Sequence, residues 1–315
     1  MDHSEIAVGS ASGPAIQPPG GSGKPGRDRN PRIFRALGPS LGRLTLGRAA
    51  LGPAVGIAAL AGLILLERRR PLRRRTEPQV LRAGRNLTVA AGAALALRLV
   101  EKPVVEPLAR TAEARGWGLL KRLKLPRAVE TIAAVALMDY TLFLWHVLMH
   151  RVGGLWRFHL VHHTDLDLDT TTALRFHFGE LIPSVVWRAL QVVLIGVSPR
   201  ALRIWQIATS ASVVFHHSNL RIPAAWERRL LWLIVTPRMH GIHHSIAQDE
   251  TDSNWSSGLT VWDRLHGTLR LDVPQDRITL GVPAYRDPAD LSALRILLMP
   301  FRRQRPTWRF PNADR

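Results

Sequence analysis

The chain has 315 residues, with 43 Lys and Arg against 24 Asp and Glu and a formal net charge of +19. This length is enough for one large domain or two ordinary ones. The absence of cysteine excludes disulfides, thiolate zinc sites, cysteine-ligated iron–sulfur clusters and a haem-thiolate centre. Any metal must therefore be held by His, Asp or Glu.

The N-terminal part predicts a leader and then a membrane hairpin. Residues 1–45, rich in Gly, Pro and Arg, are expected to be disordered because they bury too little apolar surface. Ala49 to Leu66 carries no charge and is just long enough to span a bilayer. Asn86 to Val100, with Arg98 able to reach the interface, is the second candidate. The hairpin and a basic linker occupy residues 46–128.

The arginines explain much of the positive charge without nucleic acid. A dense block follows the first apolar segment directly, as expected for a cytosolic membrane flank rather than a nucleic-acid recognition element. The block comprises Arg68, Arg69, Arg70, Arg73, Arg74 and Arg75. We therefore expect the membrane, and no nucleic acid, as a partner.

Three further apolar stretches raise the count to about four to five. They are Ile132 to Met149, Leu181 to Ser198 and Ala201 to Phe215. Ser198-Pro199 breaks the last two into a second hairpin, and Leu230 to Val235 is short enough to lie in the interface. A cytosolic loop at 67–85 then places every histidine cluster on the cytosolic face. The segment 101–128 is evidence against this topology, because it is basic and the topology places it outside.

Eleven of the 13 histidines lie between His146 and His244, and most fall in spaced groups. The groups are His146-Val-Leu-Met-His150, His159-Leu-Val-His162-His163 and His240-Gly-Ile-His243-His244. Histidines three and four apart share one face of a helix and can converge on a metal ion. The third group repeats the second 81 positions later with different intervening residues, which indicates chemistry rather than duplication.

Two more histidines stand beside the second hairpin, His177 and His217, and we expect both to be ligands. His216 is interpreted as the outward neighbour of His217. This number of imidazoles exceeds what one catalytic zinc ion needs, so two metal ions explain the set better. Imidazole suits Fe, Zn, Cu and Ni, and the ligand type alone leaves the metal open.

Together these residues resemble the fatty acid hydroxylase/sterol desaturase superfamily, and particularly its bacterial membrane members. The match runs from about Asp139 to Arg270. It includes the three spaced groups, Thr171-Thr-Ala-Leu-Arg-Phe-His177, Phe215-His-His217-Ser-Asn219 and Trp262-Asp-Arg-Leu. Two motifs depart from the usual pattern and are expected to reshape the pocket: Leu265-His266-Gly267-Thr268 and Asn254-Trp255-Ser256.

The resemblance implies an all-α, polytopic membrane helix bundle with a helical cytosolic cap that carries a di-iron site. It implies iron ligation by the ten residues His146, His150, His159, His162, His163, His177, His217, His240, His243 and His244. It also implies activation of O2 and attack on an unactivated C–H bond of a lipid-like substrate. Hydroxylation and desaturation both stay open, as do fatty acyl, sterol, carotenoid and alkyl-ether substrates.

Other polar residues are candidates for orienting the ligands. Acceptors behind a ligating imidazole fix its orientation, and the candidates are Asp139, Glu180, Asn219 and Asp263. No nucleotide-binding fingerprint or haem domain is recognisable, so the electrons must come from an external donor protein. We expect catalysis within 129–272, followed by a C-terminal extension over 273–315, in a bacterial inner membrane.

Three alternatives remain at this point. A zinc-dependent membrane hydrolase would also use His on helices, but no His-Glu-x-x-His motif occurs. A non-enzymatic metal carrier or b-haem protein would show no lipid-dependent O2 uptake. The acyl-lipid desaturases carry similar histidine groups but usually separate the first two more widely than His150 and His159.

Overall fold

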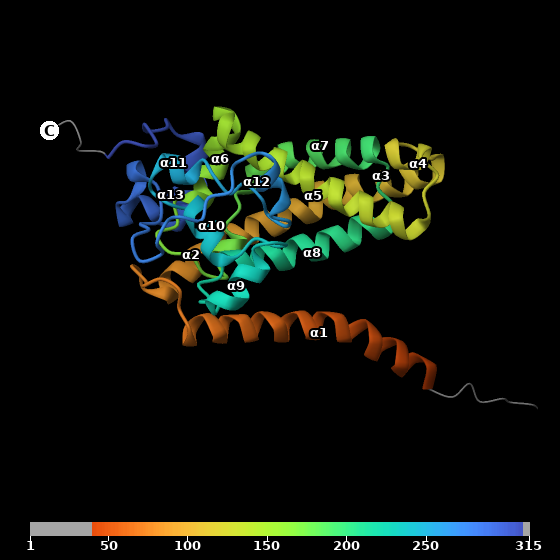
Figure 1. Ribbon diagram of the computed structural model, residues 1–315, viewed down its shortest axis with the longest axis horizontal. Coiled ribbons are helices and arrows are strands. Elements are labelled where there is room, and N and C mark those ends of the chain that lie inside the picture. Colours follow the sequence, from red (N-terminus) through yellow and green to blue (C-terminus); the bar gives the residue numbers. More distant parts are fainter. Residues whose placement is uncertain (1–39, 311–315) are drawn as a thin grey trace, which may run out of the picture. The chain divides into compact units, whose positions relative to one another are not determined.

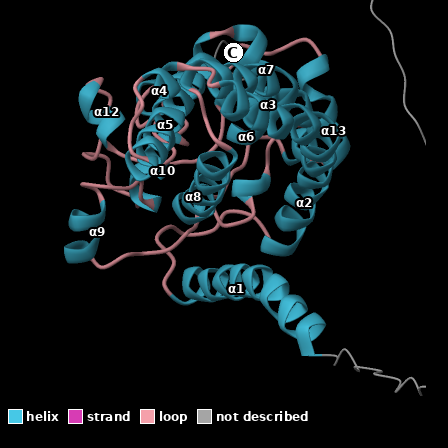
Figure 2. Cartoon of the chain, turned by 90° about the vertical axis from the view of Figure 1, so that its right-hand side faces the viewer, coloured by secondary structure: helices cyan, strands magenta, loops and turns pink. Residues whose placement is uncertain are grey.

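The computed structural model describes the backbone of residues 40–310 and the side chains of residues 54–310. Within this range the secondary structure is helical, with three isolated β-bridges and no strand (Figure 2). The predicted all-α class is therefore confirmed. The predicted leader, residues 1–45, lies almost wholly outside the described residues. The chain divides into two units, Met1–Leu51 and Gly52–Arg315, and all that follows concerns the second.

Six helices of 14 or more residues are the main elements of the described part of the chain (Figure 1). The long helices are α1 (Ser40–Arg69), α2 (Gln79–Ala96), α3 (Lys102–Arg115), α5 (Arg127–Arg151), α7 (Phe178–Ile195) and α8 (Pro199–His217). The short α-helices are α4 (Leu119–Arg122), α6 (Gly153–His163), α9 (Ala224–Leu230), α10 (Pro237–His243), α11 (Gln248–Thr251), α12 (Val261–Leu265) and α13 (Ala293–Leu298). A π-helical turn, η1 (Leu97–Glu101), joins α2 to α3, and 3-10 turns η2 (Thr172–Leu174), η3 (Pro283–Tyr285), η4 (Pro288–Leu291) and η5 (Met299–Phe301) complete the list.

Helices α3, α5, α7 and α8 pack into one bundle around a shared apolar core. Local sequence signals set where these helices begin. The Ser198 hydroxyl accepts the Ala201 N–H at the start of α8, and Pro199 occupies its first turn, where no N–H is needed. Gly196 ends α7 with φ of +85°, a left-handed conformation that glycine adopts without steric cost. The predicted break at Ser198-Pro199 is thus a real helix boundary.

The outer face of the bundle is apolar. Along α7, Ile182, Val186, Leu190 and Leu194 recur every fourth residue, and between 49% and 66% of each is exposed. Such a stripe is costly in water and normal in lipid. Two helices, α5 and α7, are long and apolar enough to cross a membrane. The first predicted span, Ala49 to Leu66, lies partly among residues whose side chains are not described and stays a prediction, while the other predicted spans do not meet that test among the described residues. The count of four to five is therefore not confirmed.

The arginine-rich approach to α2 is built into the fold instead of merely flanking a membrane. Arg73 is 7% exposed, and its side chain bonds Pro237 O, while Asn219 bonds its backbone. A Cβ at Gly241 would overlap this guanidinium, so the glycine is what lets Arg73 approach. For Arg73 the interpretation as a membrane flank was wrong.

Arg82 connects α2 to the loop that follows α6. It is 1% exposed and pairs with Asp165, at 2.9 Å, and with Asp169. Arg175 donates to Val161 O in α6, at 2.8 Å, and to Asn86 in α2. A buried ion pair that is well hydrogen-bonded fixes one arrangement of the segments it joins. The C-terminal end of α6 is therefore firmly positioned.

Candidate metal centre

Four helices bring their histidines to one place. Helix α5 carries the first spaced group at its C-terminal end, and α6 ends on the second. Helix α8 ends at His217, and α10 carries the third group. Thr236 starts α10 by accepting the Met239 N–H, with Pro237 in the first turn. An N-terminal cap fixes where a short helix begins, and with it the positions of the side chains that the helix directs to the site.

Nine of the ten predicted ligands form two groups of buried imidazoles. Within each group the potential ligand atoms all lie within 4.8 Å of one another. Site A comprises His146, His150, His159, His163 and His243. Site B comprises His162, His217, His240 and His244.

The second and third spaced groups, which we call the two triplets, each contribute histidines to both sites, and the helical spacing decides which residue enters which site. In His159-Leu-Val-His162-His163 the residues four apart enter site A and the middle one, His162, enters site B. In the other triplet the residues four apart enter site B, and His243 enters site A. Side chains four apart share a helix face, whereas the remaining histidine is rotated by about 60° from one of them and about 100° from the other. Each triplet therefore bridges two adjacent sites.

The nitrogen spacings in site B match those of ligands around one cation. His217 Nε2 lies 3.0 Å from His162 Nε2 and 3.0 Å from His240 Nε2. A metal–nitrogen bond of about 2.1 Å separates two ligands at a right angle by about 3.0 Å and tetrahedral ones by about 3.4 Å. The spacing of these nitrogens fits a metal ion.

Hydrogen bonding among the rings cannot by itself explain this arrangement. His217 Nδ1 lies 2.8 Å from Val213 O, and because a carbonyl only accepts, Nδ1 carries the proton. His217 Nε2 then has one lone pair for two neighbouring nitrogens. In site A, the Nε2 atoms of His150, His163 and His243 are buried without a hydrogen-bond partner in the described chain. Unsatisfied buried nitrogens of this kind fit ligands of a metal ion.

The protonation states also suit a metal. Burial, with a smaller contribution from nearby imidazoles, lowers the pKa of His163 and His244 well below its ordinary value. Burial lowers the pKa of His243 to about 3. These rings are therefore neutral at physiological pH, the state in which imidazole binds metal.

Protein acceptors hold several rings of site A in place. His146 Nδ1 donates to Trp255 O at 2.7 Å, and His243 Nδ1 donates to Ser253 O at 2.8 Å. Glu180 Oε1 lies 3.3 Å from His159 Nδ1. Each contact turns the Nε2 lone pair toward the centre of the site and fixes the tautomer. Glu180 thus lies where an orienting carboxylate is expected.

Three other polar candidates touch no ligand ring. Asp139 accepts the Leu259 N–H and the Trp262 indole N–H, and Asn219 bonds the backbone of Arg73. Asp263 accepts the N–H groups of Trp255 and Ser256. The predicted direct role of Asp139 and Asn219 is corrected to one of fastening loops. Asp263 acts on the site indirectly: it fixes the loop whose Trp255 carbonyl accepts the hydrogen bond from His146.

The structure separates His177 from both sites. Its Nδ1 accepts the Gly179 N–H as the N-terminal cap of α7, and its Nε2 faces Leu297 O at 3.0 Å. With both nitrogens engaged, His177 caps a helix and the predicted ligand role is corrected. His216 is only 1% exposed, and its ring centroid lies 4.1 Å from that of His240. The expectation that it points outward was wrong.

Sequence reasoning missed the role of Trp255. Its side chain is 2% exposed, and its ring packs against His150 at 4.6 Å and His243 at 5.2 Å. Asn254 before it has φ of +55°, a left-handed conformation that asparagine tolerates. The departure noted at Asn254-Trp255-Ser256 was the available signal, because it falls directly on the wall of site A.

The described chain is helical, has two helices long and apolar enough to cross a membrane, and carries two adjacent groups of buried histidines that could hold metal ions. Residues 131–268 match the sequence profile of the fatty acid hydroxylase family. The profile match and the relatives described below confirm, for this region, the resemblance to the fatty acid hydroxylase/sterol desaturase superfamily that its motifs predict.

Curated relatives point to the same family. An ornithine lipid hydroxylase of Rhizobium tropici is 29% identical over 46% of this chain and 43% of its own length. Cholesterol 25-hydroxylase of Rattus norvegicus is 25% identical over 50% of this chain and 53% of its own length. Alkylglycerol monooxygenase of Xenopus tropicalis is 29% identical over 42% of this chain and 28% of its own length. The matches thus cover about half or less of each relative, and no solved structure matches significantly.

Proposed function

We propose that this protein is an integral-membrane di-iron oxygenase that hydroxylates, or desaturates, an unactivated C–H bond of a lipid-like substrate. The observation that carries the proposal is the pair of adjacent, buried imidazole sites A and B. The relatives support the substrate class, because their names specify an ornithine lipid, a sterol and an alkylglycerol. Fatty acyl and carotenoid substrates belong to the same class of chemistry.

Two iron ions held in sites A and B would supply the reductive activation of O2. The chain's own residues provide neutral imidazoles, because burial keeps rings such as His163 and His243 unprotonated. The carbonyl oxygens of Trp255 and Ser253 accept hydrogen bonds from Nδ1 of His146 and His243. The proton therefore stays on Nδ1, and the lone pair of Nε2 is free for a metal ion. Burial also keeps bulk water from the reacting atoms.

The overall reaction balances with an external reductant. Hydroxylation consumes one O2, two electrons and two protons, and yields an alcohol and water. Desaturation consumes the same and yields an alkene and two waters. The electrons would come from a separate donor protein.

The geometry of the bundle supports one membrane arrangement. The C-terminal ends of α5 and α8 and the N-terminal end of α7 all lie at the metal sites, so the sites occupy one end of the bundle. Buried Arg73 contacts Asn219 at this same end, and the exposed arginines beside it in the chain are Arg68, Arg69, Arg70, Arg74 and Arg75. An excess of arginine marks the cytosolic side. We place the sites at the cytosolic face of a bacterial inner membrane.

Mass spectrometry of total lipids tests the proposal. Cells that express the chain should contain lipids heavier by one oxygen, or lighter by two hydrogens, than cells that express a His163→Ala variant. Identical lipid profiles would refute the oxygenase. One zinc per chain with no iron-dependent activity would favour a zinc hydrolase, and a haem absorption band would favour an electron carrier.

A further inference from the structure

The C-terminal part of the described chain forms a strongly basic surface. Residues 286–309 contain six arginines against two aspartates. We call the exposed set the arginine surface: Arg295, Arg302, Arg303, Arg305 and Arg309. Among the described residues, Asp290 pairs with Arg295 and Arg305, while no carboxylate lies within ion-pair distance of Arg302, Arg303 or Arg309.

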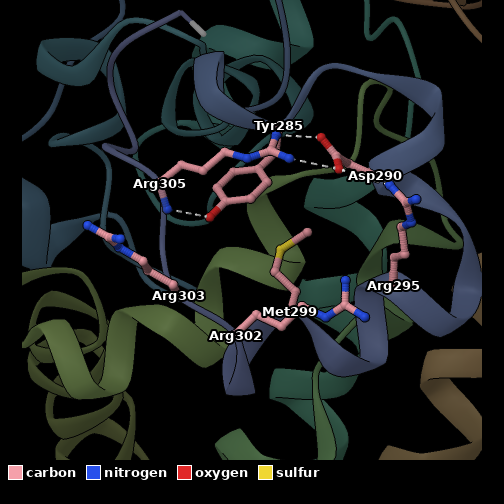
Figure 3. Close-up of a pocket in the computed structure, with 7 residues that line it drawn as sticks. All are labelled: Tyr285, Asp290, Arg295, Met299, Arg302, Arg303 and Arg305. Carbon is pink, nitrogen blue, oxygen red and sulfur yellow. Dashed lines mark hydrogen bonds and ion pairs between the residues drawn. The ribbon is translucent and has the colours of Figure 1, made fainter.

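Side chains of this surface surround a shallow hollow of about 80 Å³. Figure 3 shows Arg305 paired with Asp290 at one rim, while Arg303 points toward the opposite side. Tyr285 fastens the segment from within, since its hydroxyl accepts the Arg305 N–H at 2.9 Å. The surface is therefore anchored to the fold and leaves positive charge for a ligand.

A stack of aromatic rings leads from this surface to site A. Trp308 stacks on Trp156 of α6 with ring centroids 6.0 Å apart, and the Trp156 indole donates to Thr307. The Trp156 ring lies 4.7 Å from His150 and 5.4 Å from His163. Conjugated groups in van der Waals contact carry an electron more readily than a gap or disordered water does. The stack joins the surface to two site A rings without interruption.

The location of the surface favours a soluble partner over lipid. Figure 1 shows α13 and the C-terminal segment at the end of the helix array opposite to α4, next to the metal-bearing helices α6 and α10. The apolar stripe of α7 runs along the bundle, so a bilayer around the bundle leaves this end in water. Excess positive charge there steers acidic proteins to the surface.

We propose that the arginine surface is the docking site of an acidic one-electron carrier protein, whose electrons reach site A through Trp308 and Trp156. In each step the reduced carrier would lose one electron, and a ferric ion held by site A would accept it. No bond forms or breaks, and the tryptophans serve as packed medium without being oxidised. Two such steps supply one turnover. The inference rests on the proposed function for its metal.

The docking step is tested by binding. The iron-loaded full chain in detergent is titrated with a reduced plant-type ferredoxin as the acidic probe. The Arg302→Ser/Arg303→Ser double variant should bind about three- to ten-fold more weakly at low salt, as expected for two lost surface ion pairs. The control, Arg110→Ser/Arg122→Ser, removes the same charge near α4 and should bind like the wild type.

Three results would overturn the docking site. They are no binding by the wild type at low salt, equal weakening in both double variants, and affinity independent of salt concentration. Loss of adsorption to anionic vesicles, with ferredoxin binding unchanged, would assign the arginines to lipid instead. None of these results depends on lipid oxidation, so a failure of the proposed function is recorded separately.

The route is tested by single-turnover kinetics. Trp308→Leu should slow the reoxidation of bound reduced ferredoxin by the ferric protein several-fold, without changing ferredoxin affinity or iron content. Reduction by dithionite, which needs no docking, should keep its wild-type rate. The matched control is Trp226→Leu, an exposed tryptophan of α9. Wild-type reoxidation in Trp308→Leu, or equal slowing in both variants, would exclude the stack.

Discussion

Sites A and B are built from the same helices, but the protein holds their rings differently. In site A, three of the five rings have Nδ1 beside a protein acceptor: Trp255 O, Ser253 O and Glu180. In site B only His217 does, through Val213 O. The Nδ1 atoms of His162, His240 and His244 are buried without a partner among the described residues.

This difference has a chemical consequence. Acceptors behind a ligand fix its ring and raise its basicity, and removing them costs about 10–100-fold in metal affinity or activity. Site A should therefore bind its metal more tightly, while the rings of site B are freer to adjust. The aromatic stack ends at site A, which makes the better-held site also the natural one to receive electrons.

The largest effect is expected from removing a ligand. His163→Ala should empty site A and His244→Ala should empty site B, each lowering activity by more than about 100-fold, since even the residues behind ligands cost that much. Metal content and lipid products should fall together while membrane insertion is retained. His266→Ala, outside both sites, is the control. Full activity in both ligand variants would refute the assignment.

Loss of Arg82 should affect both sites through stability. Arg82→Met leaves Asp165 and Asp169 as uncompensated buried charges and should cost about 3–5 kcal/mol of unfolding free energy. Because the loop it holds follows His162 and His163, which serve different sites, both metals should bind more weakly. Thermal unfolding measures the effect, with exposed Arg277→Met as control. Equal stability of the two variants would show that the ion pairs are dispensable.

A smaller effect should distinguish the sites. Glu180→Gln removes the charged acceptor behind His159 and should weaken metal binding at site A by about 10–100-fold, with little change at site B. Competition with a chelator of known affinity measures both steps of metal loss. The control is Asp249→Asn, which removes an exposed carboxylate paired with Arg270. Equal weakening of both steps would contradict the difference drawn between the sites.

The smallest effect belongs to His177. His177→Ala removes a helix cap and should cost about 0.5–2 kcal/mol of stability. Metal content should be unchanged, because His177 lies in neither site. Thermal unfolding and metal analysis of the same sample check both expectations. Loss of one metal ion would restore His177 as a ligand.

The sequence alone predicted the histidine groups well, for a physical reason. Spacings of three and four place side chains on one helix face whatever the surrounding fold. The three groups therefore converge as expected, and the exchange of His162 and His243 between sites follows the same geometry. The helix boundary at Ser198-Pro199 was equally local, because a serine cap and a proline in the first turn act within a few residues.

The missed features depend on contacts between distant segments. Carbonyl oxygens of Ser253 and Trp255 carry no sequence signature, since every residue has one. Arg73 looked like a membrane flank and Arg82 drew no prediction, because their carbonyl and carboxylate partners lie more than 80 positions away. The segment treated as a C-terminal extension packs against α6 through Trp308 and Trp156. Only the folded chain reveals such pairings.

The most direct test of the two-site account is the metal content of gently purified protein, measured by inductively coupled plasma mass spectrometry. The wild type should contain two iron ions per chain, and His244→Ala should retain the one in site A. A single zinc ion with no iron in the wild type, or two irons retained in His244→Ala, would contradict the account.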